Sequence, residues 1–81
     1  VLHATAENTA LMGAERQHMR FNAVAEDGSV LPCVLFKEAA SFLPLIENNS
    51  IFDVAGELSI NEYNGRSKLQ MIVKDIRRSH N

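Results

Sequence analysis

The sequence predicts a small, mainly β domain: a five-stranded antiparallel barrel with one short helix between its third and fourth strands. Three observations support this fold class. Apolar and polar residues alternate in strand-like segments, and two tight-turn dipeptides, Asp27-Gly28 and Asn64-Gly65, separate pairs of such segments. Residues 37–47 alone carry their apolar side chains at helical spacing. Barrel closure suits a chain of this size because it removes exposed strand edges.

The first two strands are expected before the Asp27-Gly28 turn. Residues 1–12 mix apolar and small polar residues, so we expect a strand over part of them, ending at Gly13. Residues 13–17 are polar and read as a connection. From His18 to Glu26 apolar residues occupy every second position, which is typical of a half-buried strand. This strand should fold back through the turn as a hairpin.

The third strand, Val30 to Phe36, is almost wholly apolar, and Pro32 within it predicts a sheet edge or a bulge because proline lacks a donor. The helix follows over residues 37–47. Pro44 keeps this helix short, either by breaking it or by opening a second turn. We expect Asn48 and Asn49 to end the helix.

The fourth strand is expected over residues 51–62 and the fifth over residues 69–76, joined by Asn64-Gly65. Gly56 inside the fourth strand predicts a bulge or sharp bend. This element order is that of the OB-fold, a five-stranded Greek-key barrel. An SH3-like barrel is the main alternative, but it has no comparable helix before its fourth strand.

Composition limits the possible functions. The chain has 81 residues and is 46% hydrophobic, which predicts one globular domain over residues 1–81. It begins with Val, so we expect a fragment of a longer protein. No apolar run approaches the roughly 20 residues of a membrane helix, and no signal peptide is evident. A single cysteine cannot form an internal disulfide, so a cytoplasmic location is expected. Because no membrane helix is predicted, no membrane partner is expected.

Charge is unevenly distributed. Residues 1–60 hold three basic and eight acidic residues, whereas residues 61–81 hold five basic and two acidic ones. The net charge of −2 therefore conceals an acidic N-terminal part and a basic C-terminal part. The small net charge argues against a purely electrostatic nucleic-acid binder. The basic C-terminal part predicts either an anion-binding edge or a solvated strand edge protected against aggregation.

Catalytic and metal-binding patterns are lacking. The sequence has no glycine-rich phosphate loop and no nucleophile elbow. The potential zinc ligands do not form the close pairs that zinc sites use; they are His3, His18, Cys33 and His80. Cys33 is expected to be a small buried apolar residue. We interpret Asp53, Glu57, Glu62 and Asp75 as members of structural salt bridges or bonded turns rather than as acid–base catalysts.

OB barrels bind single strands in a positive groove across strands two and three, flanked by the loops between strands one and two and between strands four and five. The candidate nucleic-acid-binding residues lie in these loops and strands: Arg16, His18, Arg20, Tyr63, Asn64, Arg66, Lys68 and Lys74. Tyr63 would stack on a base while the basic residues contact phosphates. The alternative is that Tyr63 packs over the barrel end and the cations are merely solvated. With few cations, we expect weak binding in isolation and a domain that forms one wall of a larger channel.

Three segments resemble the C-terminal OB domain of the RecJ family, the bacterial single-strand-specific DNA exonucleases. They read LMGAERQHMRF from Leu11, GELSINEYNG from Gly56 and LQMIVKDI from Leu69. The second is the most specific, because this string is not generic to OB barrels. The chain departs from the family in two places. Tyr63 stands where the family often has Trp, and Ala14 and Glu15 follow Gly13, where a basic residue is common.

The resemblance implies a role that composition does not show. The family cleaves single-stranded DNA with divalent metal, manganese or magnesium, in DNA repair and recombination. Its catalytic DHH motif and accompanying phosphoesterase domain lie outside this region, so no catalysis and no cofactor are expected from these 81 residues. The expected partners are single-stranded DNA, the rest of the exonuclease chain and single-strand-binding protein. A structural or protein-interaction module that braces the exonuclease core is the alternative, and a self-contained hydrolase is a third hypothesis.

Overall fold

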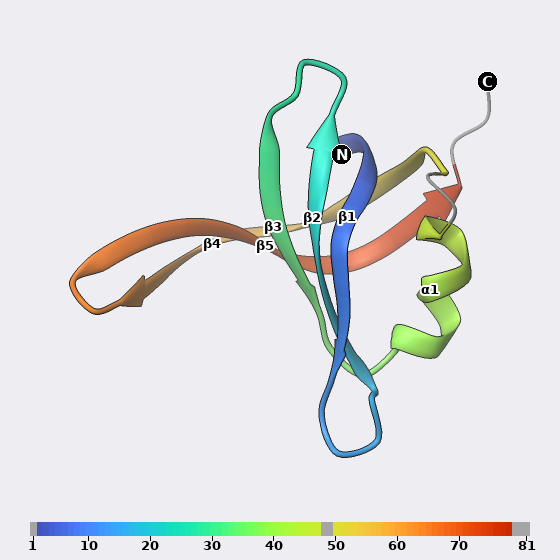
Figure 1. Cartoon of the computed structure of the whole chain (residues 1–81), viewed down its shortest axis with the longest axis horizontal. Coiled ribbons are helices and arrows are strands. Elements are labelled where there is room, and N and C mark those ends of the chain that lie inside the picture. The colour runs from blue at the N-terminus through green and yellow to red at the C-terminus, as the bar shows by residue number, and fades with distance from the viewer. Residues whose placement is uncertain (1, 48–49, 79–81) are drawn as a thin grey trace.

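A computed structural model of the chain describes residues 2–47 and 50–78, except for the side chain of Tyr63. The strands and the helix follow in the predicted order (Figure 1). They are β1 (Leu2–Met12), β2 (His18–Ala25), β3 (Val30–Leu35), α1 (Ala39–Ile46), β4 (Phe52–Tyr63) and β5 (Arg66–Arg78). The expectation that Asn48 and Asn49 end the helix lies outside the described residues.

The strands close into a barrel in the order β1-β2-β3-β5-β4, with β4 returning to β1. Four of the pairs are antiparallel, but β3 and β5 run parallel, with Cys33 opposite Met71 and Val34 opposite Ile72. The prediction of a fully antiparallel barrel is therefore wrong at this pair. The reason is directional: β4 runs antiparallel to β1, so β5, which folds back from β4, must run in the same direction as β3.

Turn chemistry sets the two hairpins. At the β2–β3 turn Asp27 accepts hydrogen bonds from the Ser29 hydroxyl and from the Ser29 backbone N–H at 2.9 Å, and these bonds lower the pKa of Asp27. Gly28 has a φ of 86°, the left-handed conformation that this three-residue loop requires. Asn64 and Gly65 both have positive φ, 50° and 74°, as a two-residue hairpin turn demands.

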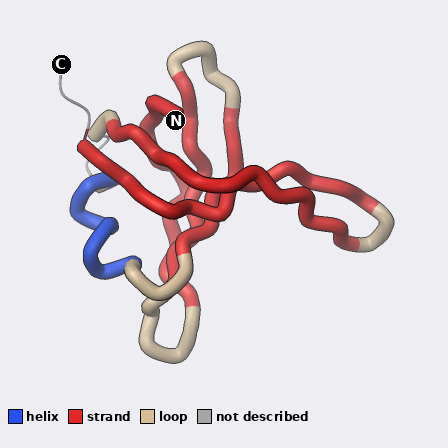
Figure 2. The backbone as a smooth tube through the Cα atoms, turned by 180° about the vertical axis from the view of Figure 1, so that it is seen from behind, coloured by secondary structure: helices blue, strands red, loops and turns tan. Residues whose placement is uncertain are grey.

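The β4–β5 hairpin extends beyond the barrel, and we call its distal part, Leu58 to Gln70, the arm (Figure 1). Seen from behind, the arm projects away from the helix side of the molecule (Figure 2). The tight turn pairs Tyr63 directly with Arg66, so both strands run to the tip. Strand β5 is consequently longer than the predicted 69–76.

A bulge interrupts the barrel part of this hairpin, as Gly56 predicts. Ala55 pairs with Asp75 but Gly56 pairs with Val73, so the extra, unpaired residue is Lys74 on β5. Pro32 pairs with Asn22 of β2 and lies just before the two residues of β3 that pair with β5. Proline has no backbone N–H to donate, and this is tolerated because Pro32 lies at the end of the β3–β5 ladder.

The core is apolar. It is formed by inward residues of all five strands and by the helix: Ala4, Met19, Phe21, Ala23, Cys33, Leu35, Ala39, Ile46, Phe52, Val54, Met71, Val73 and Ile76. Phe21 and Phe52 pack edge to face at a centroid distance of 5.7 Å. Pro44 lies inside α1, which ends two residues later. With eight residues, α1 is far shorter than the about 20 that crossing a bilayer requires, and the described part of the chain has no other helix.

Of the four acidic residues expected to be structural, Asp53 and Asp75 have side-chain partners, whereas Glu57 and Glu62 are exposed on β4. His3 Nδ1 lies 2.8 Å from Asp53 Oδ1, a pair that joins β1 to β4. Arg77 Nε donates to Asp75 Oδ2 at 2.9 Å. Cys33 is buried as predicted, and this burial raises the pKa of its thiol to about 11, so it stays a neutral thiol.

Candidate nucleic-acid interface

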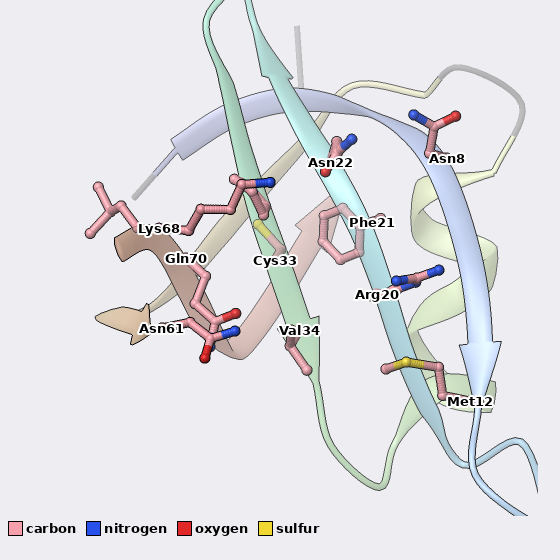
Figure 3. A pocket seen from close by; sticks show the side chains of 12 residues that line it. Asn8, Met12, Arg20, Phe21, Asn22, Cys33, Val34, Asn61, Lys68 and Gln70 are labelled. Carbon is pink, nitrogen blue, oxygen red and sulfur yellow. The ribbon is translucent and has the colours of Figure 1, made fainter. Parts of the chain in front are cut away.

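The outer face of β2 and β3 forms the floor of a groove of about 530 Å³ (Figure 3). Because successive strand residues point to opposite faces, burying Met19 and Phe21 in the core sends Arg20 and Asn22 outward. Across the ladder, Val34 lies opposite Arg20 and Pro32 opposite Asn22. The floor therefore combines one cation and one amide with apolar surface against which a base can pack.

Strand β1 supplies one rim of this groove. The pairing of β1 with β2 shifts between Glu7 and Ala10, which leaves one extra residue on β1 at a bulge. Asn8 lies at this bulge with a φ of 55° and lines the groove, as does Met12 further along β1. Bulges commonly re-aim a side chain beside a functional site. Asn8 thereby joins the groove from a strand whose regular alternation would not have brought it there.

The arm supplies the opposite wall. Lys68 pairs with Asn61, and Gln70 pairs with Ser59, so these side chains share one face of the arm. Figure 3 shows Lys68, Gln70 and Asn61 across the floor from Arg20. The bulge at Lys74 bends the hairpin at its base.

The groove is positively charged, and its lining combines polar and apolar residues. Its cations are Arg20 and Lys68, and no carboxylate occurs among the described residues that line it. The lining also holds four amides, Asn8, Asn22, Asn61 and Gln70, and the remaining lining residues are apolar. Guanidinium and ammonium groups suit phosphate, whereas amides both donate and accept and can pair with base edges or sugars. The lining thus has the chemistry of a site for a polyanion that carries hydrogen-bonding bases.

Of the residues predicted from sequence, the structure brings Arg20 and Lys68 into this groove. Arg66 lines a smaller hollow beside it, together with Lys68 and Asn61. Arg16 lies exposed in the β1–β2 turn with a φ of 55°.

The other predicted residues lie elsewhere. Asn64 is exposed at the tip of the arm, and Lys74 is exposed at the bulge, outside the groove lining. The backbone of Tyr63 ends β4, while its side chain lies outside the described part of the structure. His18 is engaged locally, because its Nδ1 accepts a hydrogen bond from the Lys37 backbone N–H at 3.0 Å.

Sequence reasoning did not single out the four amides. Asn22 was within reach, because the alternation in β2 already placed it on the same face as Arg20. Asn61 and Gln70 required the pairing of β4 with β5, and Asn8 required the bulge in β1. The two-residue Asn64-Gly65 turn sets that pairing and was therefore the available signal for Asn61 and Gln70, whereas Asn8 has no local signal because its bulge depends on the pairing with β2.

A five-stranded barrel closed in this order, with a helix between β3 and β4 and a groove across β2 and β3, is the arrangement of OB-fold domains. The sequence matches the family model of the RecJ OB domain over residues 1–75, so the chain belongs to the RecJ OB domain family. It is 32% identical over 75 residues to the single-stranded-DNA-specific exonuclease RecJ of Bacillus subtilis (strain 168). That match covers 93% of this chain but spans only 9% of the relative's length.

Proposed function

We propose that this domain holds single-stranded DNA in the groove between β1 and the arm, as an accessory domain of a RecJ-type exonuclease in DNA repair and recombination. The observation that carries the proposal is the placement of Arg20 and Lys68 on opposite sides of an amide-lined groove without a carboxylate. A single strand laid across β2 and β3 meets Arg20 on the floor and Lys68 on the arm, and its unpaired bases meet the amides of the lining. The relative's name, a single-stranded-DNA-specific exonuclease, agrees with this ligand.

We expect the groove to position the DNA strand rather than to bind it tightly. Two cations on a chain of net charge −2 give few phosphate contacts. Each phosphate contact to a single strand contributes a slope of about −0.7 to the dependence of log affinity on log salt. We therefore propose weak, salt-sensitive binding that becomes effective when the rest of a longer protein forms the remainder of the channel. Hydrolysis and its divalent metal, manganese or magnesium, are assigned to that remainder, in the cytoplasm.

Fluorescence polarisation with a labelled oligo-dT at low salt tests the groove. Arg20→Ala and Lys68→Ala should each weaken binding about fivefold, since a typical hydrogen bond contributes about 1 kcal/mol. Arg78→Ala is the matched control, because it removes the same charge from an exposed position at the end of β5 outside the groove lining. Equal affinities for all three variants would contradict the proposal.

The arm also favours a second function, that of a brace against the rest of the polypeptide. On the face opposite Lys68, Ile60 lies directly across from Leu69, with Leu58 beside them. The exposed fractions of Leu58, Ile60 and Leu69 are 62%, 66% and 50%. A contiguous apolar face of this kind typically marks a protein interface.

We infer that the occupant of this face is another part of the same RecJ-type chain, because the matched region makes up only 9% of the relative. Binding and bracing are compatible at Leu58 and Ile60, which lie outside the groove lining, whereas Leu69 borders both surfaces. Ile60→Lys should lower the thermal stability of the full-length protein but not that of the 81-residue domain. Val30→Lys, at another exposed apolar position away from the arm, is the control. An unchanged full-length melting temperature would exclude the brace while leaving the groove untouched.

A further inference from the structure

An exposed aromatic ring lies beside the groove, at a position that sequence reasoning did not single out. All four phenylalanines lie in the described part of the chain. Phe21 and Phe52 are buried and Phe42 packs against the core, whereas Phe36 is 54% exposed. Exposing a large apolar ring forgoes favourable burial, so its position calls for a physical explanation.

The cross-strand register places Phe36 next to the groove floor. Met19 pairs with Leu35 and Arg20 pairs with Val34, so the following position brings His18 opposite Phe36. The rings of His18 and Phe36 are in contact, with a centroid distance of 5.5 Å and an interplanar angle of 72°. Because period two links His18 to Arg20, the aromatic pair lies on the same outer face, about 7 Å further along the strand.

Hydrogen bonds fix the backbone that follows Phe36. The Lys37 backbone N–H donates to His18 Nδ1 at 3.0 Å, and Lys37 adopts a φ of 77° as the chain turns toward α1. Two residues later the Ala39 N–H donates to the Gln17 carbonyl at 3.1 Å. The ring is thus presented by a fixed turn rather than by a loose loop, which reduces the entropy lost when a ligand packs on it.

We propose that Phe36, supported by the edge of His18, is a stacking platform for a base of the single strand held by Arg20. The inference rests on the function proposed above and names the residue that contacts the flat face of the base. An aromatic ring suits this role because every base has a π-face, so stacking tolerates any sequence. Arg20 lies two residues beyond His18 on the same face of the sheet. A base stacked on Phe36 would therefore place the adjoining backbone phosphate close to Arg20.

The test uses the full-length protein in EDTA, so that the strand is bound and not cut. An oligo-dT carrying 5-iododeoxyuridine is irradiated on the protein, and the cross-linked peptide is mapped by mass spectrometry. We expect cross-links in the peptide that contains Phe36. Phe36→Ala should lower affinity for oligo-dT by about fivefold to a hundredfold, the range that loss of one base stack produces.

Two further variants separate stacking from folding and bulk. Phe36→Trp should keep or raise affinity, whereas Phe36→Leu keeps apolar volume but should bind as weakly as Phe36→Ala. Val30→Ala is the matched control, because Val30 is an exposed apolar residue at the other end of the same face of β3. Its affinity should equal that of the unmodified protein.

The outcomes distinguish this inference from the proposed function. If Arg20→Ala weakens binding while Phe36→Leu and Phe36→Trp bind like the unmodified protein, the platform is wrong and the groove stands. Cross-links confined to peptides without Phe36 would also overturn the platform. A full-length protein that does not bind the oligonucleotide, or that binds it equally well without Arg20 and Lys68, would overturn the proposed function itself.

Discussion

Gly56 on β4 lies so close to Ile72 on β5 that a Cβ added to the glycine would fall 2.2 Å from the Ile72 carbonyl oxygen. Ile72 pairs with Glu57 on one side and with Val34 of β3 on the other, so this contact lies where β5 is shared between two ladders. The bulge at Lys74 lies two residues further along β5, within the barrel part of the hairpin. A missing side chain at Gly56 therefore allows the barrel to close and the arm to project from it.

Gly56→Ala should destabilise the domain. The added methyl group meets backbone rather than a flexible side-chain end, so the strands must shift, at a cost of about 1–3 kcal/mol. The free energy of unfolding from urea denaturation measures this loss. Glu57→Ala, an exposed neighbour on the same strand, should change it by no more than about 0.5 kcal/mol. Equal midpoints for both variants would contradict the close approach.

The edge-to-face contact between Phe21 and Phe52 should contribute beyond simple burial. Aromatic pairs of this geometry typically add about 0.5–1.5 kcal/mol. A double-mutant cycle with Phe21→Leu and Phe52→Leu measures the coupling free energy, because leucine retains most of the apolar bulk. We expect a favourable coupling within that range. Strictly additive losses would show that the two rings act only as independent apolar residues.

Salt dependence should reveal which cations contact phosphate. Removing one phosphate contact lowers the magnitude of the slope of log affinity against log salt by about 0.7 for a single strand. We expect this reduction for Arg20→Ala and for Lys68→Ala, measured by titration of oligo-dT at several salt concentrations. Arg78→Ala should leave the slope unchanged. A slope change confined to Arg78→Ala would place the DNA outside the groove.

Cys33 should make stability fall at alkaline pH. Burial raises the pKa of its thiol from 9.0 to about 11 in the folded chain, so the unfolded chain releases this proton first. The unfolded state then binds fewer protons than the folded state, and the stabilisation present below pH 9 is lost between about pH 9 and 11. Urea denaturation across this range measures the effect.

Cys33→Ala is the control for that pH dependence. It retains every other group that titrates in the same range, so the difference between the two pH profiles isolates the thiol. The variant should show a smaller fall in stability above pH 9. Parallel profiles would mean that Cys33 gains no protection from its burial. Native Cys33 should also react slowly with thiol reagents at neutral pH, because the thiolate is the reactive form.

The local sequence determines the turns, the alternation of the strands and the helix of this protein without any tertiary contact. The Asn64-Gly65 dipeptide fixes a two-residue hairpin because both positions need positive φ, and the period of β2 sends Arg20 outward while Phe21 enters the core. The helical spacing in residues 39–46 likewise marks the one helix of the described chain. Such features depend on residues a few positions apart, so the sequence alone determines them.

Only the tertiary structure decided how these pieces meet. The parallel pairing of β3 with β5, the bulge that brings in Asn8 and the arm that carries Lys68 to the groove all join segments distant in sequence. The same holds for the surroundings of His18, a predicted DNA contact, whose Nδ1 accepts the Lys37 N–H and whose ring packs against Phe36. Strand pairing and register are set by the burial of the whole core, which no local window of sequence contains.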